Sequence, residues 1–218
     1  SILEKECNCI TPWREGRVLS KLEVIDVLRE SDAVIVRLFK ITASMLKYCS
    51  NLKVIAKHGV GVDNIDCEAA TEHGIPVLFT PRANANAVAE HTIALILSLA
   101  RDISGASRAL RDGSFADRSQ FVGVELYGKT LSIVGLGRIG RRVAEIAASG
   151  LGMNVQAYDP YLDPGEYSGP AELKESLDAV LCAADFLTLH TPLSREMRYL
   201  IDDECISMLK SGCRIVNT

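Results

Sequence analysis

Short apolar runs alternate with segments of helical periodicity along the whole chain. Apolar runs bounded by turn residues are typical of buried strands, whereas apolar residues three or four positions apart indicate helices. This alternation predicts βαβ units, and therefore an α/β fold with parallel sheets. The pattern predicts strands at residues 33–38, 53–57, 77–80, 130–134, 154–158, 186–190 and 214–217, and a further strand at 7–10.

Polar residues predict where several of the helices begin. Thr42 is expected to cap a short helix, and Asp66 a helix that ends near Gly74. Asn86 is expected to cap a long helix at residues 87–101. Since this long helix is apolar on nearly every side, we expect it to be buried.

The buried helix lies between two sheet patterns, so we expect it to connect two domains. The predicted boundaries are 1–82 for the first domain, 83–104 for the connecting helix and 105–218 for the second domain. Residues 104–128 are polar and weakly periodic, which indicates an arm or linker.

The composition fits a folded globular protein. The 218 residues are 48% hydrophobic with a mean hydropathy of +0.14, which supports a sizeable core and excludes a disordered chain. The net charge of −4 favours neither a nucleic acid nor a membrane surface as partner. The most apolar stretch, 93–97, is far shorter than the roughly 20 residues of a membrane span. Because no export signal is visible either, we expect a cytoplasmic location.

The cysteines suggest no special chemistry. There are seven, an odd number, and no CxxC pair occurs. Cys7 and Cys9 would face the same side of the predicted strand, but a metal site would need further ligands nearby. We therefore expect buried, reduced thiols and no metal.

A glycine-rich turn carries the clearest functional signal. Gly135, Gly137 and Gly140 form a GxGxxG pattern directly after an apolar strand and at the start of a helical pattern. Asp159 follows at the end of the next predicted strand. This arrangement is the fingerprint of dinucleotide-binding domains, whose sheet is of the doubly wound Rossmann type. A tight turn that binds no ligand is the alternative.

Each residue of the fingerprint has a physical role. Gly135 permits the turn out of the strand, Gly137 leaves the backbone open to the pyrophosphate, and Gly140 lets helix and strand pack closely. The helix N-terminus offers unpaired N–H groups and the positive end of its dipole to the phosphates. Asp159 would accept hydrogen bonds from the adenosine ribose and repel a 2′-phosphate. Since Pro160 and not an arginine follows, we predict NAD rather than NADP.

Other strand ends supply further candidates. His190, Thr191 and Pro192 follow one predicted strand, and Thr218 follows another. Ligands of parallel sheets bind at the carboxyl ends of strands, so we expect these residues to contact the cofactor. The alternative is that they only terminate strands.

The first half of the chain has an anion-binding candidate of its own. Residues 58–63 follow a strand and contain two glycines, so their N–H groups could bind a small anion. Arg37, at the end of another strand, could pair with an anionic substrate in the same place. An ordinary glycine turn and a solvated arginine are the alternatives.

Together these motifs resemble the D-isomer-specific 2-hydroxyacid dehydrogenase family, most closely its D-3-phosphoglycerate dehydrogenase branch. The resemblance covers essentially the whole chain, and the joint order of the motifs is specific. The matching stretches are residues 57–66, 89–94, 128–131, 135–141, 158–161 and 189–193.

The resemblance implies a two-domain enzyme that transfers hydride between NAD and C2 of a D-2-hydroxy acid, with a cleft between the domains. A flavodoxin-like substrate domain would precede the Rossmann-type NAD domain, with the first lacking its N-terminal part and the second its C-terminal part. Family members are usually dimers, and the contact would fall on residues 104–128. The assigned residues are Arg37, Val60 and Gly61 for the substrate, and Gly135, Gly137, Arg138, Ile139, Gly140, Asp159, His190, Thr191, Pro192 and Thr218 for NAD.

The chain departs from the family in one important respect. The family's catalytic arginine, glutamate and histidine would lie beyond Thr218, and none of the four histidines, His58, His73, His91 and His190, stands in the catalytic context. We therefore assign no catalytic residue, and expect residues 1–218 alone to be an inactive fragment or truncated product. An NAD-binding interaction module, similar to corepressors of the same fold, is the alternative function.

Overall fold

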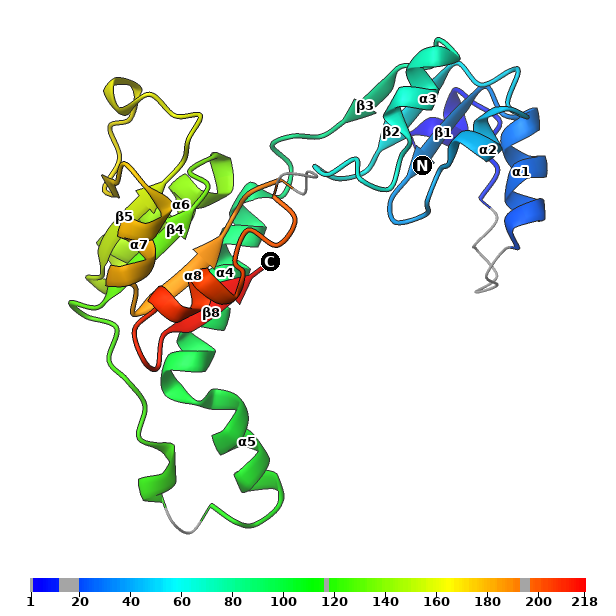
Figure 1. Ribbon diagram of the computed structural model, residues 1–218. Helices are drawn as coiled ribbons and strands as arrows, with labels where there is room; N and C mark the ends of the chain where they lie inside the picture. Colours follow the sequence, from blue (N-terminus) through cyan, green and yellow to red (C-terminus); the bar gives the residue numbers. More distant parts are fainter. Residues whose placement is uncertain (1, 12–19, 116–117, 193–196) are drawn as a thin grey trace. The chain divides into compact units, whose positions relative to one another are not determined.

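A computed structural model describes residues 2–11, 20–115, 118–192 and 197–218 (Figure 1). The chain divides into two compact units, Ser1–Ala83 and Asn84–Thr218. Both units are built on parallel sheets, so the predicted α/β class is confirmed.

The sheet of the first unit has three strands in the order β1-β2-β3. Ile55 on the central strand, together with Ile41 and Leu46, belongs to the core of this unit. The strands are β1 (Ala33–Val36), β2 (Val54–Lys57) and β3 (Val77–Phe79), and the helices are α1 (Lys21–Glu30), α2 (Ala43–Leu46), α3 (Cys67–Glu72) and the 3-10 turn η1 (Leu3–Lys5).

The second unit has a five-stranded parallel sheet in the order β6-β5-β4-β7-β8. With β4 as the first strand of this unit, the order is that of a Rossmann sheet. The strands are β4 (Thr130–Val134), β5 (Asn154–Tyr158), β6 (Glu172–Leu173), β7 (Phe186–Leu189) and β8 (Arg214–Asn217). The helices are α4 (Ala85–Arg101), α5 (Ile103–Arg111), α6 (Arg138–Leu151), α7 (Leu177–Ala183) and α8 (Asp203–Met208), with 3-10 turns η2 (Arg118–Phe121) and η3 (Pro164–Glu166).

The central strand β4 separates two apolar cores because its side chains alternate between the sheet faces. Leu131 and Ile133 pack with residues of α4 and α6, such as Ile96 and Val143. Val134 packs on the other face with residues of α7 and α8. The sheet is therefore covered on both faces, as the near-continuous apolar strands predict.

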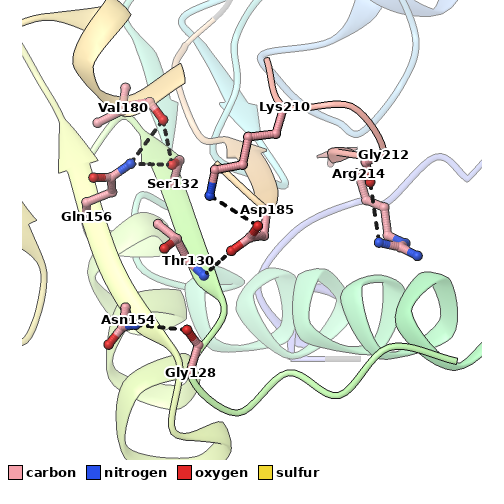
Figure 2. A network of polar contacts seen from close by, with 10 residues as sticks. All are labelled: Gly128, Thr130, Ser132, Asn154, Gln156, Val180, Asp185, Lys210, Gly212 and Arg214. Atoms are coloured by element: carbon pink, nitrogen blue, oxygen red, sulfur yellow. Dashed lines mark hydrogen bonds and ion pairs between the residues drawn. The ribbon is translucent and has the colours of Figure 1, made fainter. Parts of the chain in front are cut away.

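A small network of hydrogen bonds lies in the buried interior next to this sheet (Figure 2). The Gln156 amide donates to Ser132 Oγ over 2.8 Å and to the Val180 carbonyl over 3.0 Å. The Ser132 hydroxyl in turn donates to the same carbonyl over 2.7 Å. Both side chains are buried, so these bonds offset the desolvation of their polar groups. They join β4, β5 and α7.

Most predicted boundaries are confirmed to within a residue or two, but several details are wrong. Residues 7–10 form no strand, because no neighbouring strand pairs with them. Asn86 does not cap α4, which begins one residue earlier; its Oδ1 accepts from Arg142 Nε over 2.9 Å. The long helix is not buried on every side, since Leu99 is 46% exposed.

The arm at residues 104–128 contains more regular structure than its weak periodicity indicates. It continues α5 and includes η2. Asp102, in the left-handed conformation with φ of 44°, ends α4 and caps α5 by accepting from Gly105 N. The helix α1 was not predicted at all, although Ser20 and Glu23 form a capping box at its start.

The cysteines are all free thiols, as expected, but they are not all buried. Cys49 and Cys205 are buried, whereas Cys7 and Cys182 are exposed. Among the described residues, no group of three or more His, Cys, Asp or Glu side chains is placed to hold a metal ion. No helix of the described ranges combines the length and apolar character of a membrane span.

Candidate functional site

The carboxyl ends of β4 and β7 form the topological switch point of the second sheet. From β4 the chain proceeds through β5 to β6 on one side, whereas β7 continues to β8 on the other. Ligands of doubly wound sheets bind outside the strand ends at such a point. The helix α6 begins there, directly after β4 (Figure 1).

Gly135 makes the turn out of β4. Its φ of +91° lies in the region that favours glycine. A Cβ at this position would lie 2.7 Å from the His190 carbonyl oxygen and 3.1 Å from Thr191 Cγ2. The residues after β7 therefore pack directly on the glycine turn.

The two other glycines meet opposite surroundings. A Cβ on Gly140 would lie 2.2 Å from the Gly135 carbonyl oxygen, so α6 and β4 approach as closely as the backbone allows. A Cβ on Gly137 would meet nothing within 4 Å, and this residue is exposed. The space next to Gly137 is therefore open to a ligand.

The donors that face this space are the first N–H groups of α6. Gly137 is the N-cap residue and has no side chain that could cap the helix. Arg138 and Ile139 are the first two helical residues, exposed and half-buried respectively. N–H groups in a first helical turn have no intrahelical acceptor, so they remain available to an anion. The residues present therefore fit a pyrophosphate.

Asp159 is held rigidly beside the turn. Its Oδ2 accepts from Leu136 N over 2.8 Å, and its Oδ1 accepts from Tyr161 N over 3.0 Å. A carboxylate has about four acceptor positions, so each oxygen retains one for another donor. The half-buried carboxylate can therefore bind two hydroxyl groups without breaking its own bonds.

The residues after β7 and β8 lie where they were predicted, at the carboxyl edge. His190 Nε2 shares a hydrogen bond of 3.1 Å with Thr188 Oγ1, and burial lowers the pKa of His190 to about 4. Thr191 is half-buried and Pro192 is exposed, whereas Leu193 lies outside the described residues.

Thr218 lies beside the long helix. Its Oγ1 is 3.4 Å from Thr92 Oγ1, and Thr92 is fully buried on α4. The Thr92 hydroxyl donates to the Val88 carbonyl over 2.8 Å. This places Thr218 in contact with α4 of the same unit.

The first unit holds a second candidate, which we call the anion loop, residues 58–64 after β2. Among the described residues, no acceptor takes the N–H group of Val60 or Gly61. Gly59, with φ of +148°, provides the bend that leaves these two groups unpaired. Arg37 lies exposed after β1, the strand that pairs with β2. Since parallel strands end at the same edge, the sheet brings Arg37 and the anion loop to one side.

Sequence reasoning missed Lys57 at this site. Lys57 is the last residue of β2 and only 9% exposed, and its ammonium donates to the Arg37 carbonyl and to Asn64 Oδ1. The available signal was a lysine at the end of an apolar strand, next to a glycine-rich loop.

A cavity of about 250 Å³ lies elsewhere, at the amino ends of β4, β7 and β8. Asp185 and Lys210 line it and pair over 3.2 Å, and Asp185 also accepts from Thr130 N (Figure 2). None of the predicted site residues lines this cavity. It lies at the edge opposite to the one where doubly wound folds bind ligands.

Comparisons with known proteins agree with this site. Residues 93–218 match the family described as D-isomer specific 2-hydroxyacid dehydrogenase, NAD binding domain. The chain is 44% identical over 202 residues to D-3-phosphoglycerate dehydrogenase of Methanocaldococcus jannaschii, covering 91% of the chain and 38% of that relative. It is 41% identical over 204 residues to the enzyme of the same name from Pongo abelii, covering 93% and 38%. The chain thus spans well under half the length of these relatives.

Solved structures show the same architecture. D-lactate dehydrogenase from Aquifex aeolicus, complexed with NAD and lactic acid, is 31% identical with a TM-score of 0.80, covering 88% of this chain and 58% of that one. NAD-dependent formate dehydrogenase from Staphylococcus aureus, in complex with NAD, is 30% identical with a TM-score of 0.81, covering 91% and 60%. The alternative of a non-catalytic interaction module gains no support from these comparisons.

The glycines allow a direct separation of folding from binding. We expect Gly140→Ala to destabilise the second unit by roughly 2–3 kcal/mol, because its methyl group meets backbone. We expect Gly137→Ala to leave the urea midpoint unchanged but to weaken NAD binding at least on the order of tenfold, since its methyl group fills the phosphate space. Calorimetric titration together with urea unfolding checks both. Full NAD affinity in Gly137→Ala would contradict this assignment.

His190 gives the second unit a specific pH dependence. Its pKa falls from 6.5 to about 4 on folding, so between these values only the unfolded chain binds the proton. The contribution of His190 to the free energy of unfolding is therefore fully present above pH 6.5. As the pH is lowered towards 4, the free energy of unfolding falls by up to about 3 kcal/mol. Urea unfolding at a series of pH values should show a steeper loss in wild type than in His190→Gln. Parallel curves for the two proteins would show that burial does not shift this histidine.

Proposed function

Because the chain belongs to the D-isomer specific 2-hydroxyacid dehydrogenase family, we propose that it forms the NAD- and substrate-binding part of an oxidoreductase. The reaction is hydride transfer between NAD(H) and C2 of a D-2-hydroxy acid or the corresponding 2-oxo acid. One observation carries the proposal: an open glycine turn at the switch point, with a fixed carboxylate at the end of the next strand. When bound, NAD supplies the hydride chemistry, and the protein supplies binding and orientation.

Different residues around the turn bind different parts of NAD. The N–H groups of Arg138 and Ile139 bind the pyrophosphate, in the space that Gly137 leaves open. Asp159 accepts the two adenosine ribose hydroxyls with its remaining lone pairs. The segment His190–Pro192 and Thr218, at the ends of β7 and β8, contact NAD from the other side of the turn.

The substrate is a small anionic 2-hydroxy acid. In the first unit, the unpaired N–H groups of Val60 and Gly61 bind its carboxylate, and the exposed Arg37 guanidinium pairs with its negative charge. Relatives at 44% and 41% identity are named D-3-phosphoglycerate dehydrogenase, so D-3-phosphoglycerate is the first substrate to test.

His190 is poorly suited to the proton transfer of this reaction. An effective acid–base group has a pKa near the working pH, whereas burial lowers that of His190 to about 4.

The decisive experiment assays the complete gene product. NADH oxidation should occur with 3-phosphohydroxypyruvate, or with hydroxypyruvate or 2-oxoglutarate if the substrate differs. Tight NADH binding without turnover of any of these acids would refute the dehydrogenase and favour the interaction module.

Cofactor choice provides a prediction for one residue. Asp159→Ala should weaken NAD binding on the order of tenfold or more and NADP binding much less, because the carboxylate holds ribose hydroxyls but repels a 2′-phosphate. Calorimetric titrations with both cofactors measure the ratio. The substitution also strands the buried Leu136 N–H, so Asp159→Asn, which retains one acceptor, is the control for folding. A wild-type protein that prefers NADP would contradict the role of Asp159.

We further propose that the protein is a cytoplasmic homodimer joined through the arm. Ile103 and Leu110 are 53% and 61% exposed and lie seven residues apart on α5, hence on the same face. Val122, also in the arm, is 81% exposed. Exposed apolar side chains grouped in this way favour a contact with a second copy. Seven free thiols are compatible with a reducing compartment.

The dimer prediction concerns the exposed face of α5. Leu110→Glu should convert the dimer to a monomer, because it places a charge in the apolar contact. Ser149→Glu adds the same charge at an exposed position of α6, outside the arm, and should leave the dimer intact. Sedimentation velocity distinguishes the two states. A monomeric wild-type protein would rule out the proposed assembly.

A further inference from the structure

A buried lysine lies beneath the anion loop. The side chain of Lys57 passes under Gly59, where a Cβ would lie 3.4 Å from Lys57 Cε. Its ammonium contacts the segments that follow β1 and β2. It donates to the Arg37 carbonyl and, over 2.5 Å, to Asn64 Oδ1. The lysine therefore bonds both to the segment that carries Arg37 and to the far end of the loop that carries Val60 and Gly61.

Asn64 extends this connection. Its side-chain Nδ2 donates to the Phe39 carbonyl over 2.6 Å, and the Asn64 backbone carbonyl accepts from Ile41 N over 2.8 Å. The residues after β1 and the residues after β2 are thus held together through one amide side chain and one ammonium. Backbone hydrogen bonds join Ile41 to Asn64 and Asp66, and His58 N to the Val36 carbonyl. The two side chains add the carbonyls of Arg37 and Phe39 to these contacts.

The fold by itself does not need an ammonium here. Burying a charge is costly, and a methionine of similar length would fill the space under Gly59 without that cost. The lysine instead places a buried positive charge next to Gly59, in the first part of the anion loop, where it would favour a bound carboxylate.

We propose that Lys57 is a positioning residue for the substrate carboxylate. Through Asn64 and the Arg37 carbonyl, it keeps the Val60 and Gly61 donors and the Arg37 guanidinium at one fixed spacing, ready to bind an anion without prior reorganisation. This inference rests on the proposed function, since it takes the anion loop to be the substrate site.

The test compares two lysines of the same segment. Lys57→Met removes the buried ammonium, whereas Lys53→Met removes an exposed one that pairs with Asp32 at the opposite end of the β1–β2 pair. The complete gene product carrying ¹⁵N-labelled valine and glycine is titrated with D-3-phosphoglycerate, and the Val60 and Gly61 amide resonances report binding. Unfolding midpoints of both variants are measured in parallel.

We expect Lys57→Met to weaken the affinity on the order of tenfold, as loss of a charge-assisted contact does. Lys53→Met should leave affinity unchanged, and Lys57→Arg should restore part of it. Asn64→Ala, which keeps the lysine but removes its acceptor, should weaken binding as well. This variant decides the matter if Lys57→Met does not fold.

The outcomes separate the two proposals. If wild type binds and Lys57→Met or Asn64→Ala binds equally well, the positioning role is refuted and the proposed function stands. If the complete gene product reduces 2-oxo acids but the Val60 and Gly61 resonances do not respond, the anion loop is not the carboxylate site. If the complete product shows no turnover, the proposed function itself fails.

Discussion

The contact between α6 and β4 at Gly140 is the constraint on which the cofactor site depends. Because Gly140 has no side chain, the helix begins directly over the Gly135 carbonyl. A side chain there would push the first turn of α6 away from the sheet edge. The unpaired N–H groups of Arg138 and Ile139 then would no longer meet the end of β4. The absence of a side chain at Gly140 is thus required both for the placement of α6 and for the anion-binding position of its first N–H groups.

The same geometry explains why Asp159 fits two roles. Its carboxylate accepts from Leu136 N, so it stabilises the glycine turn from the neighbouring strand. It keeps acceptor positions free at the same time, so it can bind hydroxyl groups without rearrangement. A ligand that bonds to Asp159 therefore meets a group whose orientation folding has already fixed.

The anion loop of the first unit resembles the glycine turn in construction but uses different residues. Here too, adjacent parallel strands deliver their following residues to one edge, where a glycine loop leaves N–H groups unpaired. The charge comes from side chains and not from a long helix: Arg37 is exposed to a ligand and Lys57 is buried behind the loop. Each unit thereby combines backbone donors with fixed polar side chains: Asp159 in the second unit, and Arg37 and Lys57 in the first.

Local sequence patterns were sufficient to predict every described strand except β6, together with the parallel class, the glycine turn and the position of Asp159. These features depend on local signals: apolar runs of strand length, and residue types at fixed spacing along the chain. Such signals fail where partners decide the outcome. Residues 7–10 have strand-like composition but no neighbouring strand, and Asn86 bonds to Arg142 of another helix instead of capping its own.

Contacts between residues far apart in the sequence depend on how the strands and helices pack. That Thr191 packs on Gly135, that Thr218 lies beside Thr92, and that Lys57 reaches both the Arg37 carbonyl and Asn64 follows from strand order and helix packing. No periodicity encodes those contacts, because each depends on where a distant segment places its backbone. The sequence thus specifies the chemistry available at each strand end, and the fold determines which of these groups act together.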